Sequence, residues 1–394
     1  MNAIRTRLLS TCERVNQPRI GLIHTVTRRM RSSRLPVLAR DLGLLAAALI
    51  APAATAISQQ YDLSGLPSYH DDTNPQELHG VIRIHGTELT QHLIHQWEDA
   101  FLKLHPLVRF SDYMLPSGFS GLCAGTADIN VMGHTAWRSD LKAFQESFGY
   151  EPFEVMFATG GFNLRKGNTP APVIFVNKEN PIDRLSLSQL DGIFGAQRTG
   201  GWDGTHWSTA SARGPEKDIR TWGQLGLTGE WKDKPIHLYG IDATLSNWSE
   251  LIQRVVFKGG DKWNPAMNEI VRGGVEIPAD AQIVSSVATD PYGIGFNLMR
   301  VVEKNPGVKP LAIAAKDEGP FVAPTAESCY QRTYPLVNAV YLYLNRPPGK
   351  PLDRRLKEFL KFVLSREGQQ IIVEDGMFIP LNPEAVREEL RKLD

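Results

Sequence analysis

Apolar and polar positions along residues 80–149 follow two periods that predict strands and helices in turn. Residues 80–86 (GVIRIHG) predict a short strand. In residues 87–106 the apolar positions recur at helical spacing: Leu89, Leu93, Trp97, Phe101 and Leu104. Residues 107–115 predict a second strand, 116–125 a serine-led turn into a short helix, and 127–149 another strand, turn and helix. This repetition predicts a parallel α/β sheet with ligand-facing turns at the carboxyl ends of its strands.

The second half of the chain continues the pattern after an interruption. Residues 171–194 predict a strongly apolar strand, an Asn-Pro turn and an amphipathic helix, at the entry to a second domain. Residues 195–221 keep no period and are expected to be a loop, whose Trp202, His206 and Trp207 either contact a ligand or pack. The predicted elements that follow are a strand and helix at 237–256, strands at 290–298 and 307–315, and one long helix at 352–376.

The first 56 residues differ from the rest of the chain. Arginines crowd positions 5–40, and an apolar stretch, Leu42–Ala56, ends in Ala54-Thr55-Ala56. A basic region, a short apolar region and a small-x-small ending are typical of a secretory signal peptide. A membrane anchor is the alternative, but the apolar run is shorter than the ~20 residues that span a bilayer. We therefore expect residues 1–56 to be cleaved, 57–77 to form a flexible leader, and the true start to lie as far downstream as Met30.

Composition and charge limit the classes of molecule that the chain is expected to bind. With 42% hydrophobic and 22% charged residues, the 394-residue chain is typical of globular proteins and long enough for two domains. The first 56 residues hold nine arginines and two acids, so a chain cleaved there carries 34 basic and 41 acidic residues, or about −7. Such a surface disfavours nucleic acid and anionic membranes. Cys123 and Cys329 remain after cleavage, and either a disulfide or two free thiols is compatible with their spacing.

Sequence motifs of catalysis are absent. The segment SGFSGLC lacks the second glycine of a nucleophile elbow, and the chain has neither a P-loop nor an HExxH motif. One stripe of potential metal ligands falls on the polar face of the helix predicted at 87–106: Glu88, His92, His95 and Asp99. Ligands spread over three helical turns cannot all reach one ion, so a solvated polar face is the preferred interpretation. No metal and no other cofactor is predicted.

Four turns place hydroxyl or small residues where a helix is predicted to begin. They are Gly86-Thr87, Pro116-Ser117-Gly118, Gly133-His134-Thr135 and Thr244-Leu245-Ser246. Taken singly, each is an adequate helix cap. Taken together at strand carboxyl ends, the four turns are compatible with a cradle of N–H groups and hydroxyls that binds one anion without lysine or arginine.

Several segments resemble, in order, the phosphate-type solute-binding proteins of ABC importers. These are GTELTQHLIHQWEDAF, AGTADINVMG, VIFVNKENPIDRLSLSQLDGIF, LYGIDATLSNWSELI, YGIGFNL and EFLKFVLSREGQQIIVEDGMFIPL. The resemblance covers residues 78–383. It implies a periplasmic-binding-protein type II fold, an α/β structure of two hinged lobes with mixed sheets flanked by helices. The first lobe is expected to comprise 78–172 and 291–394, and the second lobe 173–290, with crossings near 172–177 and 290–296.

The resemblance also implies the ligand-binding residues. They are Gly86, Thr87, Glu88, Ser117, Gly118, His134, Thr135, Asp242, Thr244 and Ser246. Asp242, and Glu88 at the first helix, would favour protonated hydrogenphosphate over sulfate. The family's fourth turn carries an arginine and then Ser-Gly-Thr, whereas this chain has Ile241 and Leu245 in the arginine and glycine positions. The fourth turn therefore departs from the family pattern at both positions.

Three functional hypotheses follow. The first is a monomeric periplasmic solute-binding protein, without enzymatic activity, that delivers phosphate or a related small oxyanion to an ABC permease in the inner membrane. The second is a secreted, ligand-degenerate member of the same fold that acts as an interaction or sensory protein. The third is a secreted enzyme such as a phosphatase, which the absence of a nucleophile and base set disfavours.

Overall fold

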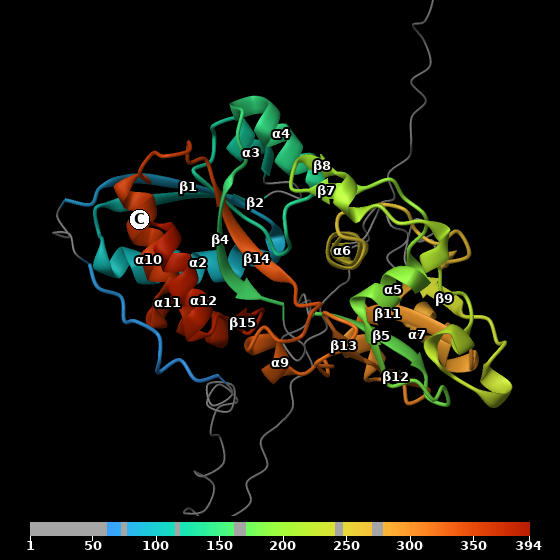
Figure 1. Ribbon diagram of the computed structural model, residues 1–394. Helices are drawn as coiled ribbons and strands as arrows, with labels where there is room; N and C mark the ends of the chain where they lie inside the picture. Colours follow the sequence, from blue (N-terminus) through green and yellow to red (C-terminus); the bar gives the residue numbers. More distant parts are fainter. Residues whose placement is uncertain (1–60, 72–76, 115–118, 161–170, 241–246, 270–278) are drawn as a thin grey trace, which may run out of the picture. The chain divides into compact units, whose positions relative to one another are not determined.

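The computed structural model describes residues 61–71, 77–114, 119–160, 171–240, 247–269 and 279–394. The chain divides into two units, 1–51 and 52–394, and all described residues lie in the second. This unit contains two main sheets, each with its own helices (Figure 1). We call the six-stranded sheet and its helices the first lobe, and the five-stranded sheet and its helices the second lobe.

The first-lobe sheet has the order β15-β4-β14-β3-β1-β2. Its strands are β1 (Gly80–Gly86), β2 (Val108–Met114), β3 (Ile129–Val131), β4 (Phe153–Thr159), β14 (Ala339–Leu344) and β15 (Ile379–Pro380). Strand β1 is parallel to β2 and β3, as predicted, with Ile84 opposite Ile129 and Gly86 opposite Val131. Strand β14 runs antiparallel to β3 and β4. The sheet is therefore mixed, and β1, β3 and β4 all end at the same edge.

Helices cover both faces of this sheet (Figure 1). On one face lie α2 (Gln91–Leu104), α10 (Arg354–Leu364), α11 (Arg366–Asp375) and α12 (Pro383–Lys392). On the other lie α3 (Phe119–Cys123) and α4 (Arg138–Phe148), around a smaller apolar cluster that includes Phe119, Phe144 and Tyr343. The helical spacing predicted for 87–106 is confirmed at Leu93, Trp97 and Phe101, which are buried, whereas Leu104 is 43% exposed.

The single long helix predicted for 352–376 is wrong. Helix α10 ends at Leu364, Ser365 is extended (φ −74°, ψ 169°), and α11 begins at Arg366. The Ser365 hydroxyl accepts a hydrogen bond from the Gly368 backbone N–H and so caps the second helix. The apolar spacing continued through the break because both helices bury the same kind of face, and the serine alone carried the signal for the break.

The prediction of a flexible leader at 57–77 is wrong where the structure describes it, at 61–71 and at Glu77. Tyr61, Leu63 and Leu66 are buried in the main core cluster. The Pro67 carbonyl accepts from the Arg366 backbone N–H (2.8 Å), and the Tyr69 N–H donates to Glu367 (2.7 Å). These apolar residues are interspersed with turn-forming residues and follow no helix or strand period, so the sequence did not predict their burial. The predicted signal peptide, residues 1–56, lies outside the described residues.

The second-lobe sheet has the order β10-β9-β11-β5-β12. Its strands are β5 (Pro172–Asn177), β9 (His237–Gly240), β10 (Asn268–Glu269), β11 (Gly293–Leu298) and β12 (Val308–Pro310). A two-stranded sheet pairs β6 (Arg184–Ser186) with β13 (Ala312–Ala314). The helices are α5 (Leu187–Phe194), α6 (Asn247–Leu251), α7 (Ala279–Thr289) and α8 (Met299–Val302), and α9 (Ala326–Tyr330) follows the last of these strands.

The boundary predicted at residues 290 and 291 falls too early in the chain. Strand β11 pairs with both β5 and β9, and β12 pairs with β5, so residues 293–310 belong to the second lobe. The chain rejoins the first sheet only at β14. A return strand and a central strand of the other lobe are both short and apolar, and only the hydrogen-bond partners distinguish them.

The predicted loop 195–221 contains a short hairpin, formed by β7 (Gly201–Asp203) and β8 (His206–Ser208). Single helical turns follow at Thr209–Ser211, Pro215–Lys217, Trp222–Leu225 and Gly229–Trp231. Gly259 packs against this hairpin. Its φ is +80°, and a Cβ there would lie 1.8 Å from the Trp202 carbonyl oxygen. Only glycine fits this position.

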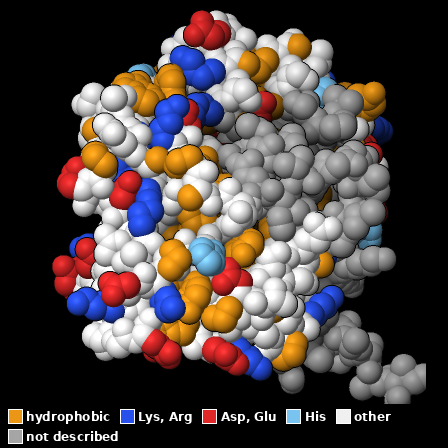
Figure 2. Space-filling model, turned by 90° about the vertical axis from the view of Figure 1, so that its right-hand side faces the viewer, with side chains coloured by type: hydrophobic (Ala, Val, Ile, Leu, Met, Phe, Trp, Pro, Cys, Tyr) orange, Lys and Arg blue, Asp and Glu red, His pale blue; other side chains and the backbone are white. Residues whose placement is uncertain are grey.

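Two further features bear on the sequence predictions. Cys123 and Cys329 are both free thiols, so the possible disulfide is excluded. Within the part of the chain that the structure describes, no helix combines the length and apolar character needed to cross a membrane. On the face shown in Figure 2, acidic and basic side chains are interspersed.

Candidate functional site

The carboxyl ends of β1, β3 and β4 gather small and hydroxyl residues at one edge of the first-lobe sheet. Gly86 ends β1 in a tight place, since a Cβ there would lie 3.1 Å from each of Ile94, Met114 and the Val131 carbonyl. Thr87 follows, and its backbone N–H donates to the Val131 carbonyl (3.3 Å). Close packing of β1 on β3 therefore favours glycine, and Thr87 lies at the end of the strand.

The hydroxyl of Thr87 is buried and has no hydrogen-bond partner. Thr87 precedes a short helical turn in the extended conformation of a cap (φ −94°, ψ 153°), yet its side chain makes no capping bond. Thr159, the last residue of β4, also has a buried hydroxyl without a partner and is 1% exposed. A buried hydroxyl without a partner is costly to the fold, so Thr87 and Thr159, at the carboxyl ends of β1 and β4, are candidate donors to a ligand.

The turn after β3 places His134 and Thr135 at the same edge. His134 Nδ1 lies 2.7 Å from the Thr135 carbonyl. Burial lowers the pKa of His134, with the Thr135 carbonyl opposing the change, so the ring is neutral near pH 7. The Thr135 hydroxyl donates to the Ala339 carbonyl (3.3 Å) and accepts from Arg254 Nη2 (3.1 Å). Thr135 is thus already engaged, unlike Thr87.

Arg254 was not identified in the sequence. It lies in a π-helical turn, Ile252–Val256, that directly follows α6. It also pairs with Glu250 (Nε to Oε1, 3.5 Å), and burial raises the pKa of Glu250. The family pattern places its arginine at the start of the fourth turn, 241–246, whereas Arg254 comes after that turn. The local signal was weak, because an extra residue in a helical turn leaves little trace in the apolar period.

Arg254 lines a pocket of about 420 Å³. Its walls come from the turn after β3, from α4, from the β7–β8 hairpin and from the π-helical turn. The lining residues include Thr135, Arg138, Leu141, Trp202, Asp203, Glu250, Arg254 and Lys258. Arg138 lies over the Trp202 ring (5.4 Å to its centroid) and donates to the Gly259 carbonyl (3.2 Å). The hairpin of loop 195–221 therefore both packs and lines a pocket.

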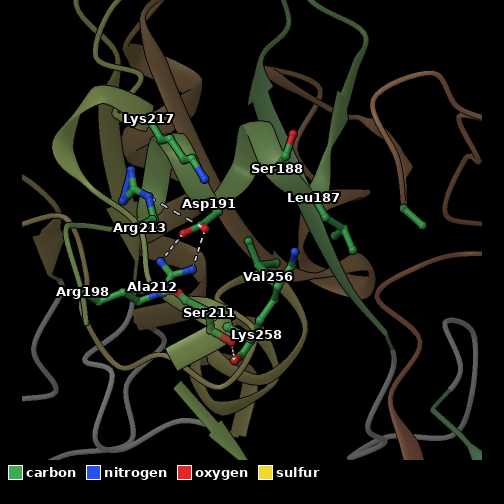
Figure 3. Close-up of a pocket in the computed structure, with 12 residues that line it drawn as sticks. Leu187, Ser188, Asp191, Arg198, Ser211, Ala212, Arg213, Lys217, Val256 and Lys258 are labelled. Carbon is green, nitrogen blue, oxygen red and sulfur yellow. Dashed lines mark hydrogen bonds and ion pairs between the residues drawn. The ribbon is translucent and has the colours of Figure 1, made fainter. Parts of the chain in front are cut away.

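A second pocket, of about 210 Å³, lies beside α5 (Figure 3). Arg198 forms two hydrogen bonds of 2.7 Å to the Asp191 carboxylate, and its Nε donates to the Ser211 carbonyl (2.9 Å). Arg213 pairs with Asp218 and lies 3.9 Å from Asp191. Both guanidinium groups pair with carboxylates, which offset their positive charge, although Arg213 Nε and Nη1 are buried without a hydrogen-bond partner.

Half of the predicted ligand-binding residues are described. Gly86, Thr87, His134 and Thr135 lie at the carboxyl edge of the first-lobe sheet, and Glu88 is exposed at the start of the helical turn after Thr87. Ser117, Gly118, Asp242, Thr244 and Ser246 lie outside the described residues. Thr159 and Arg254 are additions that sequence reasoning missed.

Comparison with known proteins places the chain in a family. Residues 170–367 match the PBP superfamily domain, the domain of substrate-binding proteins. The chain belongs to the phosphate-type substrate-binding proteins of ABC transporters, as the sequence predicted.

Two relatives and two solved structures illustrate the similarity. The phosphate-binding protein PstS of Pseudomonas aeruginosa is 31% identical over 330 residues, which are 83% of this chain and 90% of that protein. Protein SphX of Synechococcus elongatus is 23% identical over 270 residues, covering 68% of this chain and 67% of SphX. Among solved structures, an ABC-type phosphate transport receptor from Vibrio cholerae is 19% identical with a TM-score of 0.46, over 76% of this chain and all (100%) of that chain. PstS from Borrelia burgdorferi is 17% identical with a TM-score of 0.48, over 77% and 99%.

Proposed function

We propose that this chain is the exported, monomeric solute-binding component of an ABC importer, and that it binds phosphate or a related small oxyanion. It would work in the periplasm after loss of residues 1–56, passing its ligand to a permease in the inner membrane, without catalysing a reaction. The observation that carries the proposal is the buried, unpartnered Thr87 hydroxyl at the sheet edge, in a chain 31% identical to a phosphate-binding protein.

The chemistry of the edge favours a protonated tetrahedral anion. Hydroxyl groups donate to the ligand oxygens, and Arg254 next to Thr135 supplies a positive charge partly offset by Glu250. Binding then depends on local donors, because a chain cleaved at residue 56 carries a net charge of about −7. We propose that Asp242 accepts the proton of hydrogenphosphate and so selects phosphate over sulfate. Ser117, Gly118, Thr244 and Ser246 complete the cradle in this proposal.

The test is a phosphate titration of wild type, Thr87→Val and Thr87→Ser by isothermal titration calorimetry. A hydrogen bond to a charged acceptor contributes about 1.5–3 kcal/mol, so Thr87→Val should lose about tenfold or more in affinity. Thr87→Ser keeps the hydroxyl and should stay within a few-fold of wild type. Because no folded-state bond is lost, the melting temperature of Thr87→Val should not fall.

Other results of these experiments would support the alternative hypotheses. A Thr87→Val variant that loses about 1 kcal/mol of stability but keeps its phosphate affinity would make Thr87 a helix cap. Wild type that binds no phosphate at millimolar concentration would favour the ligand-degenerate protein. Turnover of a chromogenic phosphate ester would contradict the binding-protein proposal altogether.

A further inference from the structure

A cluster of three potential metal ligands lies on the first lobe, where α2 packs beside the edge strand β2. His95 and Glu98 are three residues apart on α2 and so share one side of the helix. Asp112 lies on β2 two residues after Phe110, and alternation along the strand gives both side chains the same face. Phe110 contacts Phe101 of α2, with ring centroids 6.1 Å apart, so this face of β2 is turned toward the helix.

The ligand atoms of these three side chains converge. One atom from each of His95, Glu98 and Asp112 lies within 4.8 Å of the other two. His95 Nε2 is 3.0 Å from Asp112 Oδ2. The His95 and Asp112 side chains are 47% and 31% exposed, so the cluster is open to solvent on one side.

Glu98 is the unusual member of the cluster. It is only 7% exposed, and its Oε1 is buried without a hydrogen-bond partner. The charged groups that act on Glu98 include two carboxylates and no lysine or arginine. A carboxylate buried among other acids is costly unless a cation joins it.

We propose that His95, Glu98 and Asp112 bind a divalent transition metal ion, for which Zn²⁺ is the best match. One imidazole and two carboxylates are ligands that Zn²⁺ accepts, and three protein ligands leave a fourth position for water. Ligand bonds of about 2.0–2.2 Å place tetrahedral donor atoms roughly 3.4 Å apart. Because the three ligand atoms are spread over distances of up to 4.8 Å, Glu98 or Asp112 must move inward by roughly an ångström to bind the ion.

The sequence pointed to a different set of ligands. Of the stripe Glu88, His92, His95 and Asp99, only His95 joins this cluster. His92 Nδ1 instead lies 2.6 Å from Asp375 Oδ1 on α11. The metal site needs a ligand from β2, and no periodicity within one helix predicts such a partner. The ion would fasten α2 to the edge strand β2, and its ligands lie between Thr87 and Ser117 in the sequence.

The experiment uses the full chain without a histidine tag, in phosphate-free buffer at neutral pH. Zn²⁺ is titrated by competition with a chromogenic chelator, and Co²⁺ is added separately to read its visible absorption. Wild type is expected to bind one tight equivalent of Zn²⁺, to show Co²⁺ bands and to melt at higher temperature with Zn²⁺. Glu98→Gln and His95→Gln should each weaken this equivalent at least tenfold and lose the Co²⁺ bands.

Two matched variants of the same helix serve as controls. His92→Gln removes an exposed histidine one turn away, and Asp99→Asn removes the acid next to Glu98; both should keep wild-type affinity for Zn²⁺. Wild type without a tight equivalent, or Glu98→Gln that binds as wild type does, would overturn the proposal. So would equal losses in the controls. Phosphate affinity should not change in Glu98→Gln, so the metal site and the proposed function can fail separately.

Discussion

Two clusters of charged side chains, one in each lobe, differ in whether their carboxylates have cationic partners. In the second lobe, Asp191 receives two hydrogen bonds from Arg198, and Arg213 pairs with Asp218. In the first lobe, Glu98 is buried beside Asp112 with a histidine as its only basic neighbour. The second-lobe cluster is complete in the sense that both carboxylates have guanidinium partners, although Arg213 Nε and Nη1 are buried without a hydrogen bond. The first-lobe cluster is incomplete in this sense, and the proposed metal ion would supply its missing cation.

The same distinction applies to hydroxyl groups. Thr135 donates to Ala339 and accepts from Arg254, so its hydroxyl is accounted for in the folded chain. The hydroxyls of Thr87 and Thr159 are buried and have no partner. All three are threonines of one sheet, so residue type alone does not separate the bonded hydroxyl from the two unpartnered ones.

The largest expected effect comes from breaking the complete cluster. Asp191→Asn leaves Arg198, whose side chain is 3% exposed, without its carboxylate. Removing one partner of a buried pair costs about 3–5 kcal/mol, and we expect a loss of this size in the free energy of unfolding. Chemical denaturation measures it, with the exposed Glu216→Gln as the control that should stay within about 0.5 kcal/mol. A loss below 1 kcal/mol in Asp191→Asn would remove the contrast between the clusters.

A smaller effect of opposite sign is expected in the incomplete cluster. Glu98→Gln replaces a buried acid that has no cationic partner with a neutral side chain of nearly the same shape. Without added metal, we expect the free energy of unfolding to rise by about 1 kcal/mol, because the cost of burying the charge is removed. Denaturation of the chelator-treated chain at pH 8 tests this. A loss of 2 kcal/mol or more would mean that Glu98 has a structural partner within the chain.

The smallest expected effect concerns the pH dependence of stability that comes from the burial of Tyr61. Tyr61 packs in the core, and burial, followed by nearby Cys329 and Glu327, raises its pKa from 10.0 to about 12. A folded-state pKa above the unfolded value gives stability that is complete below pH 10 and is lost as pH rises toward 12. Wild type should therefore lose roughly 0.5–1 kcal/mol more than Tyr61→Phe between pH 9 and pH 10.5.

Paired denaturation curves of the two proteins at these pH values provide the measurement. Parallel losses in wild type and Tyr61→Phe would show that Tyr61 ionises as it does in the unfolded chain. The segment at 61–71 would then be less firmly packed than its burial indicates.

The sequence was a good guide to individual elements because their signals are local. The strand at 80–86 and the burial of Trp97 on α2 follow directly from the spacing of apolar residues. The family resemblance identified Thr87 because it lies in a short turn whose pattern survives in this chain. The break at Ser365 was missed, since a single capping residue competes with two flanking helical periods.

What the sequence by itself determined is the set of strands and helices, the α/β class and the family. Tertiary structure decided which strands share a sheet, so that β11 and β12 belong with β5 rather than with the first lobe. It also decided which side chains meet across the chain: Arg254 beside Thr135, and Asp112 beside His95. Backbone periodicity is set by neighbours along the chain, whereas the presence or absence of a partner for a buried polar group depends on residues far away in the sequence.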